Sequence, residues 1–146
     1  MPTVLVADDN TLIAVTLSAI LKQQKYTVVT ATSLGEVEQI TRGIRPDLVL
    51  LDVNFGRVHS LNLAKRLRQQ AFNLLLISGE SSTADLLMRH GWLEREVRIL
   101  AKPIHPLELL REIHAAVTQQ LVGLGHADTR SSDESTERVA AAVASS

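Results

Sequence analysis

The 146-residue sequence contains no cysteine, which excludes disulfides, thiolate zinc sites and cysteine nucleophiles. Aromatic residues make up only 3% of the chain, so its core must be built from Leu, Ile, Val and Ala. The formal net charge of −1 predicts no attraction to nucleic acids or membranes by charge alone. No apolar run approaches the roughly 18 residues that span a bilayer, and the N-terminus has no secretory signal pattern. We therefore expect a soluble, cytoplasmic protein.

Hydrophobic residues make up 45% of the chain. They follow a regular alternation of strand and helix patterns along the sequence. Short apolar runs predict strands near 4–7, 26–29, 48–51, 74–77 and 97–101. Apolar residues at helical spacing predict helices near 13–21, 34–44, 61–71, 83–92 and 106–121, the second of them capped by Ser33 with Glu36 three residues later. The strands are unbroken apolar runs, which indicates burial on both faces. The pattern predicts a doubly wound α/β fold with a parallel sheet.

The composition changes after residue 124. The last stretch is rich in Ser, Ala, Asp, Glu and Thr and has almost no large apolar residue. Such a segment cannot bury enough apolar surface to offset its ordering entropy. We expect one folded domain over residues 1–124, a disordered tail over residues 125–146 and no second domain.

Chemistry-bearing residues stand where the predicted strands end. Asp8 and Asp9 follow the first strand, Asp52 ends the third, Ser78 the fourth and Lys102 the fifth. Open parallel sheets bind ligands beyond the carboxyl ends of their strands, so these side chains should converge. Three neighbouring carboxylates repel one another, and Mg²⁺ with its preference for oxygen ligands would neutralise them. The alternatives are helix capping for single aspartates, a turn hydroxyl for Ser78 and a solvated surface amine for Lys102.

Four short motifs carry a resemblance to a known family. They read Val-Ala-Asp8-Asp9-Asn10, Leu-Leu-Asp52-Val-Asn54, Ile-Ser78-Gly79-Glu80 and Ala-Lys102-Pro103. In this order, at the ends of strands one, three, four and five, they resemble the response-regulator receiver domains of two-component signalling. The resemblance covers about residues 3–121. It implies a flavodoxin-like (βα)5 sheet with strand order 2-1-3-4-5.

The resemblance also implies a Mg²⁺ site. Asp9 and Asp52 would bind the ion directly together with the backbone carbonyl of Asn54, and Asp8 would act mostly through water. Asn54 and Glu80 resemble family positions that tune the rate of dephosphorylation. Their alternative is plain solvent-facing polarity.

The resemblance implies that Asp52 is a phosphoacceptor, loaded by a histidine kinase or a histidine phosphotransfer protein. Ser78 would hydrogen-bond a phosphoryl oxygen. Lys102 would pair with the carboxylate before phosphorylation and with the phosphoryl group afterwards, and the Lys102–Pro103 peptide should be cis. We expect a signalling module rather than an enzyme, with no output domain of its own. The last helix is a candidate for a homodimer contact.

The chain departs from the family pattern at three positions. Gly56 stands where proline is usual and Ser60 where glycine is usual, so the loop should be looser or differently shaped. Ile99 replaces the Tyr or Phe that commonly lies three residues before the lysine. This last change affects how a signal would leave the site, and it does not affect phosphorylation.

Two other functions compete with the receiver interpretation. A pseudo-receiver would serve as a docking surface without being phosphorylated, and Ile99 keeps this alternative open. A phosphohydrolase of the haloacid dehalogenase type would also use a nucleophilic Asp, Mg²⁺ and a Lys. It would require a D-x-D motif on the first strand, a spacing that Asp8 and Asp9 lack, and it would usually require an inserted cap.

Overall fold

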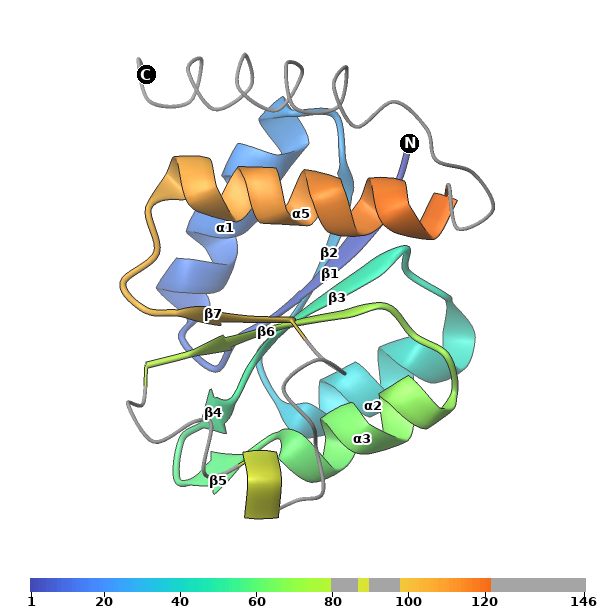
Figure 1. The fold of residues 1–146 in the computed structure, drawn as a ribbon, viewed down its shortest axis with the longest axis vertical. Helices are drawn as coiled ribbons and strands as arrows, with labels where there is room; N and C mark the ends of the chain where they lie inside the picture. The colour runs from blue at the N-terminus through green and yellow to red at the C-terminus, as the bar shows by residue number, and fades with distance from the viewer. Residues whose placement is uncertain (80–86, 90–97, 122–146) are drawn as a thin grey trace. The chain divides into compact units, whose positions relative to one another are not determined.

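The computed structural model describes residues 1–79, 87–89 and 98–121 of the chain. The chain divides into two units, Met1–Pro103 and Ile104–Ser146. The first unit contains the whole of the β-structure that is described and the first three helices (Figure 1).

A five-stranded parallel sheet forms the centre of the first unit. Its strands are β1 (Thr3–Ala7), β2 (Thr27–Ala31), β3 (Leu48–Asp52), β6 (Leu74–Ser78) and β7 (Arg98–Ala101). They lie side by side in the order β2-β1-β3-β6-β7. The order confirms the predicted doubly wound fold, because β6 and β7 are the fourth and fifth strands of this sheet.

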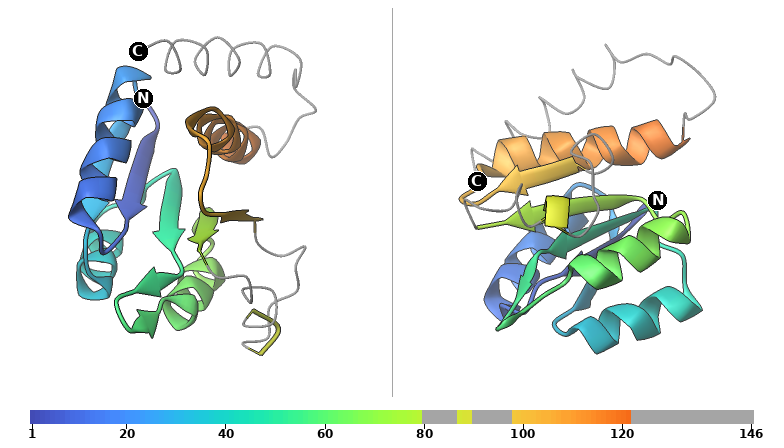
Figure 2. Two further views of the ribbon diagram at one scale, coloured as in Figure 1. Left: turned by 90° about the vertical axis from the view of Figure 1, so that its left-hand side faces the viewer. Right: turned by 60° about the horizontal axis from the view of Figure 1, so that its bottom comes forward.

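Helices cover both faces of this sheet (Figures 1 and 2). They are α1 (Thr11–Gln23), α2 (Leu34–Gly43) and α3 (Leu61–Gln69). The chain moves outward from β1 to β2 and then back past β1 to β3, so right-handed crossovers put α1 on one face and α2 with α3 on the other. Residues 87–89 are helical, and the rest of the helix predicted near 83–92 lies outside the described residues.

The core of the first unit is aliphatic. A cluster of buried residues joins one face of the sheet to α2 and α3, and its members on the five parallel strands lie in register with one another: Leu5, Ala7, Ala31, Val49, Leu51 and Leu76. The intervening strand residues point to the opposite face and are also buried: Val4, Val6, Leu48, Leu50, Leu75 and Ile77. The central strands are therefore buried on both faces, as the unbroken apolar runs predicted.

The helix termini follow their local sequence. The Oδ1 atom of Asn10 accepts a hydrogen bond from the amide of Ile13 at the start of α1 (3.2 Å). Ser33 caps α2 as predicted, its Oγ accepting a bond from the Glu36 amide at 3.1 Å. Beyond the end of α3, Ala71 has a φ of +65°, a left-handed conformation that favours glycine.

Replacing Ala71 by glycine should stabilise the protein. The substitution relieves the backbone strain of a Cβ at positive φ, and we expect a gain of about 0.5–1 kcal/mol in the free energy of unfolding. Ala19→Gly, at an exposed position within α1, is the matched control and should cost about 0.5–1 kcal/mol. Denaturant unfolding measures both. A loss of stability at both positions would show that the conformation of Ala71 is not strained.

A short hairpin between β3 and α3 was not predicted. Its strands, β4 (Asn54–Phe55) and β5 (Val58–His59), pair in antiparallel fashion around Gly56 and Arg57. Gly56 has a φ of +62° at the first central position, as a type II′ turn requires. Phe55 is buried in the core cluster. The segment for which the sequence predicted a looser or differently shaped loop thus forms a hydrogen-bonded hairpin.

The second unit is described through its helix α5 (Pro106–Leu121), which begins at the predicted proline. Its buried residues recur at helical spacing: Leu109, Leu110, Ile113, Ala116 and Val117. None of the helices in the described ranges combines the length and the hydrophobicity needed to cross a bilayer. The predicted tail lies outside the described residues, so the division into 1–124 and 125–146 stays a prediction.

Candidate functional site

The register of the sheet brings the predicted acidic residues together. Ala7 is paired with Leu51, so the next residues along the two strands, Asp8 and Asp52, come side by side at the carboxyl edge. Asp9 follows at the start of the loop to α1. One carboxylate oxygen from each of the three aspartates lies within 4.8 Å of the other two. The convergence predicted from the strand ends is confirmed for these residues.

Asp52 is 4% exposed, and both of its carboxylate oxygens are engaged. Oδ1 accepts a hydrogen bond from the backbone amide of Asn54 at 3.0 Å. Oδ2 accepts one from Lys102 Nζ at 2.6 Å, a charge-assisted contact. The carboxylate is thereby held in one orientation at the centre of the cluster.

Lys102 reaches the acids from the end of β7. Its amide donates to the Ser78 carbonyl (2.8 Å), and the Lys102–Pro103 peptide is cis, as predicted. Its Nζ also lies 3.7 Å from Asp8 Oδ2. Burial by itself would lower the pKa of Lys102, but the hydrogen bond and charge of Asp52, with the charges of Asp8 and Asp9, outweigh it and raise the pKa above its ordinary value. The amine therefore remains a cation.

Asp8 is as buried as Asp52, with 4% exposure. Burial raises the pKa of the Asp8 carboxyl above its ordinary value, and the charge of Asp52 adds to this effect. The Asn10 amide, which donates to Asp8 Oδ1 at 2.9 Å, and the charge of Lys102 oppose it. Two buried carboxylates therefore share a single neighbouring ammonium group, so the site carries an excess of negative charge.

Asp9, by contrast, is exposed, and it contacts the unpredicted hairpin. Its Oδ2 accepts a hydrogen bond from the Gly56 amide at 2.7 Å. At the other end of the hairpin, the buried Ser60 donates from Oγ to the Asp52 carbonyl at 2.6 Å. Sequence reasoning identified both Gly56 and Ser60 as unusual but contained no signal for these bonds, which depend on the hairpin.

The donor set suits a hard divalent cation. Three carboxylates converge, and two of them are buried beside one ammonium group. Mg²⁺ takes oxygen ligands, typically one or two carboxylates with water and phosphate oxygens. Asp8, Asp9 and Asp52 can therefore hold this ion.

The remaining residues that the sequence analysis identified are Ser78, Ile99 and Glu80. Ser78 ends β6 and is 2% exposed, beside Gly79 at the edge of the site. Gly79 is close enough to Lys102 that an added Cβ would lie 3.8 Å from the lysine Cδ. Ile99 is partly buried against the core cluster. Glu80 lies outside the described residues.

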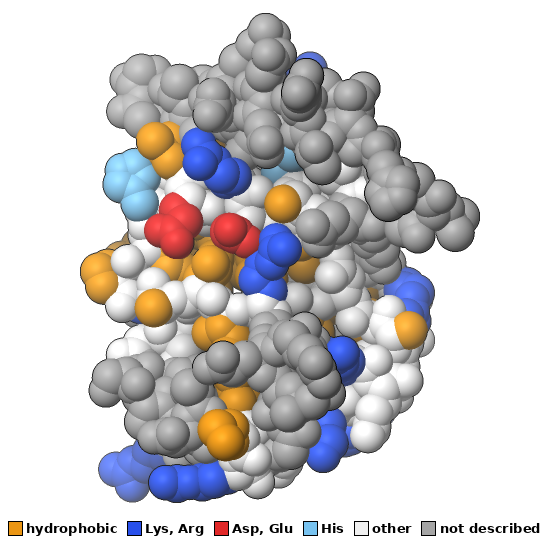
Figure 3. Space-filling view, viewed as in Figure 1, with side chains coloured by type: hydrophobic (Ala, Val, Ile, Leu, Met, Phe, Trp, Pro, Cys, Tyr) orange, Lys and Arg blue, Asp and Glu red, His pale blue; other side chains and the backbone are white. Residues whose placement is uncertain are grey.

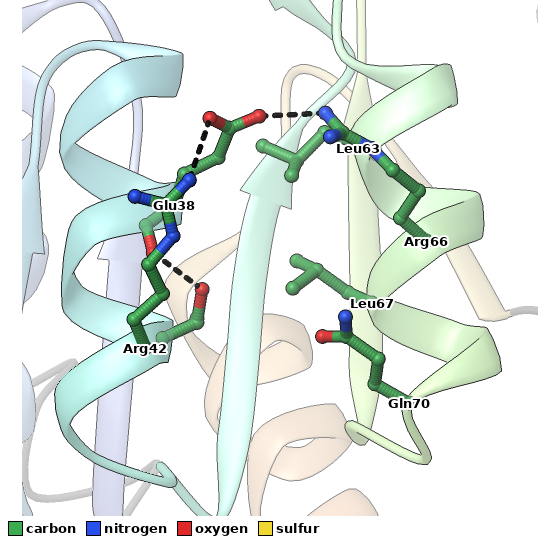
Figure 4. A pocket seen from close by; sticks show the side chains of 7 residues that line it. Glu38, Arg42, Leu63, Arg66, Leu67 and Gln70 are labelled. Carbon is green, nitrogen blue, oxygen red and sulfur yellow. Dashed lines mark hydrogen bonds and ion pairs between the residues drawn. The ribbon is translucent and has the colours of Figure 1, made fainter.

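A separate groove runs between α2 and α3 (Figure 4). Leu63 and Leu67 line it, and Glu38 lies between Arg66 at 2.6 Å and Arg42 at 4.0 Å. The two arginine side chains are 60% and 80% exposed, so these pairs contribute little stability. On the face drawn in Figure 3, hydrophobic side chains occur in small groups among polar ones. Neither feature offers the chemistry of the aspartate cluster.

Comparison with solved structures supports the same fold. A CheY-like receiver domain protein from Methanospirillum hungatei matches with a TM-score of 0.74 and 20% identity, covering 84% of this chain and 98% of that chain. Response regulator TrrA from Thermotoga maritima was solved in complex with Mg²⁺ and BeF. It matches with a TM-score of 0.66 and 21% identity, and the match covers 80% of this chain and 99% of TrrA.

Sequence comparison identifies the family. The aerobic respiration control protein ArcA of Escherichia coli K12 is 30% identical over 109 residues, which cover 74% of this chain and 45% of ArcA. The regulatory protein PhoP of Bacillus subtilis is 29% identical over 116 residues, which cover 78% of this chain and 46% of PhoP. The chain thus spans about half the length of these curated relatives. The sequence model of the response regulator receiver domain matches residues 4–114. The chain belongs to the response regulator receiver domain family.

Proposed function

We propose that this chain is a phosphoacceptor that takes a phosphoryl group onto Asp52 from a phosphohistidine of a histidine kinase or phosphotransfer protein. The observation that carries the proposal is the pairing of the buried Asp52 carboxylate with Lys102 at 2.6 Å, beside Asp8 and Asp9. This arrangement combines a carboxylate nucleophile with cationic charge, which phosphoryl transfer requires.

The transfer step uses one oxygen of Asp52. That oxygen attacks phosphorus, the P–N bond to the donor imidazole breaks, and the bonding electrons leave with the imidazole nitrogen. An acyl phosphate remains on Asp52. The Asn54 amide and the Lys102 ammonium hold the carboxylate in place before attack, which lowers the entropy cost of aligning the reactants.

Charge neutralisation completes the mechanism. Bound Mg²⁺ would neutralise negative charge on the phosphoryl oxygens and on the aspartates. Asp9, Asp52 and the Asn54 carbonyl would be its protein ligands, and Asp8 would contact its water. After transfer, Lys102 pairs with a phosphoryl oxygen in place of the carboxylate, and the Ser78 hydroxyl donates to another.

A small-molecule phosphoryl donor distinguishes this function from its competitors. With acetyl phosphate and Mg²⁺, a phosphoacceptor is modified once per chain as a base-labile acyl phosphate, a hydrolase releases phosphate continuously, and a pseudo-receiver is not modified. Quantifying protein-bound and free phosphate over time separates the three. Stoichiometric labelling supports the proposal, whereas continuous turnover without a bound phosphoryl group, or no labelling at all, contradicts it.

The phosphoryl donor must contact the surface beside Asp52, and α1 offers an apolar surface there. Leu12 is 74% exposed and Val15 is 58% exposed, three and six residues after Asp9. Exposed apolar residues at an interface exclude water and contribute much of its binding energy. We propose that Leu12 and Val15 contact the phosphohistidine-bearing partner.

Leu12→Asp should slow phosphotransfer from the cognate protein partner by about tenfold, because it puts a charge into the apolar contact. Labelling by acetyl phosphate should be unchanged, since that donor makes no such contact. An acid in the first turn of α1 is compatible with the helix dipole. Ile44→Asp is the control, because Ile44 is 46% exposed but precedes β3 and so lies at the opposite edge of the sheet. Equal rates for all three proteins would exclude α1 as the contact.

A further inference from the structure

The β4–β5 hairpin is hydrogen-bonded to the aspartate cluster at both of its ends. At its tip, the Gly56 amide donates to Asp9 Oδ2 at 2.7 Å. At its base, Ser60 donates from Oγ to the Asp52 carbonyl at 2.6 Å and from its amide to the Val53 carbonyl at 2.7 Å. One short element thus links an exposed carboxylate on the β1 side of the site to the main chain of the residue that ends β3.

The Ser60 hydroxyl is used in an unusual way. Ser60 occupies the N-cap position of α3, where a serine side chain normally accepts a hydrogen bond from a backbone amide of the first helical turn. Here it makes no such bond. The residue is fully buried, and its hydroxyl donates to Asp52 instead. This hydroxyl therefore stabilises the position of Asp52 rather than the helix terminus.

The Gly56 amide fixes the orientation of an exposed side chain. Asp9 is exposed, and an exposed carboxylate samples several rotamers. A carboxylate has two oxygens with about four acceptor positions, so an amide bound to Oδ2 leaves Oδ1 for a cation. A hydrogen bond to a metal-binding carboxylate orients that ligand before the metal arrives.

Both contacts depend on residues that are unusual for the family. Proline at position 56 would have no N–H to donate, and glycine at position 60 would have no hydroxyl. Gly56 also supplies the positive φ of the turn that aims its amide at Asp9.

We infer that the β4–β5 hairpin is the orienting element of the cation site, with Gly56 and Ser60 as positioning residues that set its affinity for Mg²⁺. The inference rests on the proposed function, because it assigns Asp9 and Asp52 to the ion. Gly56 holds the Asp9 carboxylate in its binding rotamer, and Ser60 holds the main chain from which the Asp52 side chain projects.

The first test is a Mg²⁺ titration of the full chain, in which amide chemical shifts report binding. Ser60→Ala removes the hydroxyl, and Ser18→Ala makes the same change at a buried serine of α1. Gly56→Val strongly disfavours positive φ, whereas Gly56→Asn is strained there to a smaller extent, and an added Cβ meets no neighbour within 4 Å. Ser60→Ala and Gly56→Val should each weaken Mg²⁺ binding by about tenfold or more. Ser18→Ala should retain the wild-type affinity, and Gly56→Asn should lose less affinity than Gly56→Val.

Wild-type affinity in folded Ser60→Ala and Gly56→Val would overturn the inference, as would equal weakening in Ser18→Ala and Gly56→Asn. If the wild-type chain shows no Mg²⁺ binding, the proposed function fails instead.

A second test needs no metal and no change in the hairpin. Hydrogen exchange at the Gly56 amide should be about tenfold faster or more in Asp9→Ala than in the wild type, because its charged acceptor is gone. The Leu50 amide within β3 serves as an internal reference and should exchange equally in both. Equal exchange at Gly56 in the two proteins would show that the Asp9 contact does not hold the hairpin.

Discussion

Asp9→Ala should abolish Mg²⁺ binding and reduce phosphoryl transfer to Asp52 by about a hundredfold or more. The expected loss has an electrostatic cause. Asp9 is the one exposed acid of the cluster and so the most accessible to a hydrated cation. Without it, Asp8 and Asp52 remain beside Lys102, whose single charge cannot both hold the nucleophile and neutralise an incoming phosphoryl group.

The matched control is Asp47→Ala. Asp47 is also an aspartate next to a strand end, but it precedes β3 and so lies at the opposite edge of the sheet. Its Oδ2 accepts a hydrogen bond from the Thr3 amide at 2.7 Å. This variant should lose some stability and keep both Mg²⁺ binding and labelling. Mg²⁺ titration and labelling with acetyl phosphate measure the two effects. Unchanged metal binding in Asp9→Ala would remove Asp9 from the ligand set.

Asp52→Asn should show no phosphorylation at all. The amide is nearly the same size as the carboxylate, and its single oxygen can still accept a hydrogen bond from the Asn54 amide or from Lys102, though not from both. The change is confined to this side chain, so the fold should be retained. It is no nucleophile at neutral pH, and no acyl phosphate can form on it. Asp8→Asn provides a useful comparison, because it also removes one buried charge of the cluster but leaves the nucleophile in place. Its labelling should be slower and still measurable.

Labelling of Asp52→Asn at the wild-type level would show that another residue accepts the phosphoryl group. Asp8 and Asp9 are the neighbouring carboxylates that a donor could then reach. Circular dichroism of the variant confirms that a loss of labelling does not come from unfolding.

The sheet and the acid cluster were predictable from the sequence for one physical reason. Strands buried on both faces are unbroken apolar runs, so their ends are visible in the sequence, as at Leu51 before Asp52. In a parallel sheet all carboxyl ends meet at one edge, so knowing the ends is enough to bring Asp8, Asp52 and Lys102 together. The contact between Lys102 and Asp52 was predicted from the resemblance to receiver domains, because strand ends alone do not specify which side chains touch.

The hairpin was not predictable in the same way. Its strands have two residues each, too short to show a period, and its closing turn contains a single glycine beside Arg57. Whether Gly56 would loosen the loop or form a turn depends on Phe55 entering the core and on Asp9 accepting the amide. Those contacts are tertiary, and the sequence near Gly56 does not record them.

The most direct test of the proposed phosphoacceptor role is mass spectrometry of the chain after incubation with acetyl phosphate. Intact mass should increase by one phosphoryl group, only when Mg²⁺ is present, and reductive trapping of the acyl phosphate followed by peptide mapping should place the modification on Asp52. No increase in mass, a Mg²⁺-independent increase, or a modification mapped to any other residue would contradict the role proposed for Asp52.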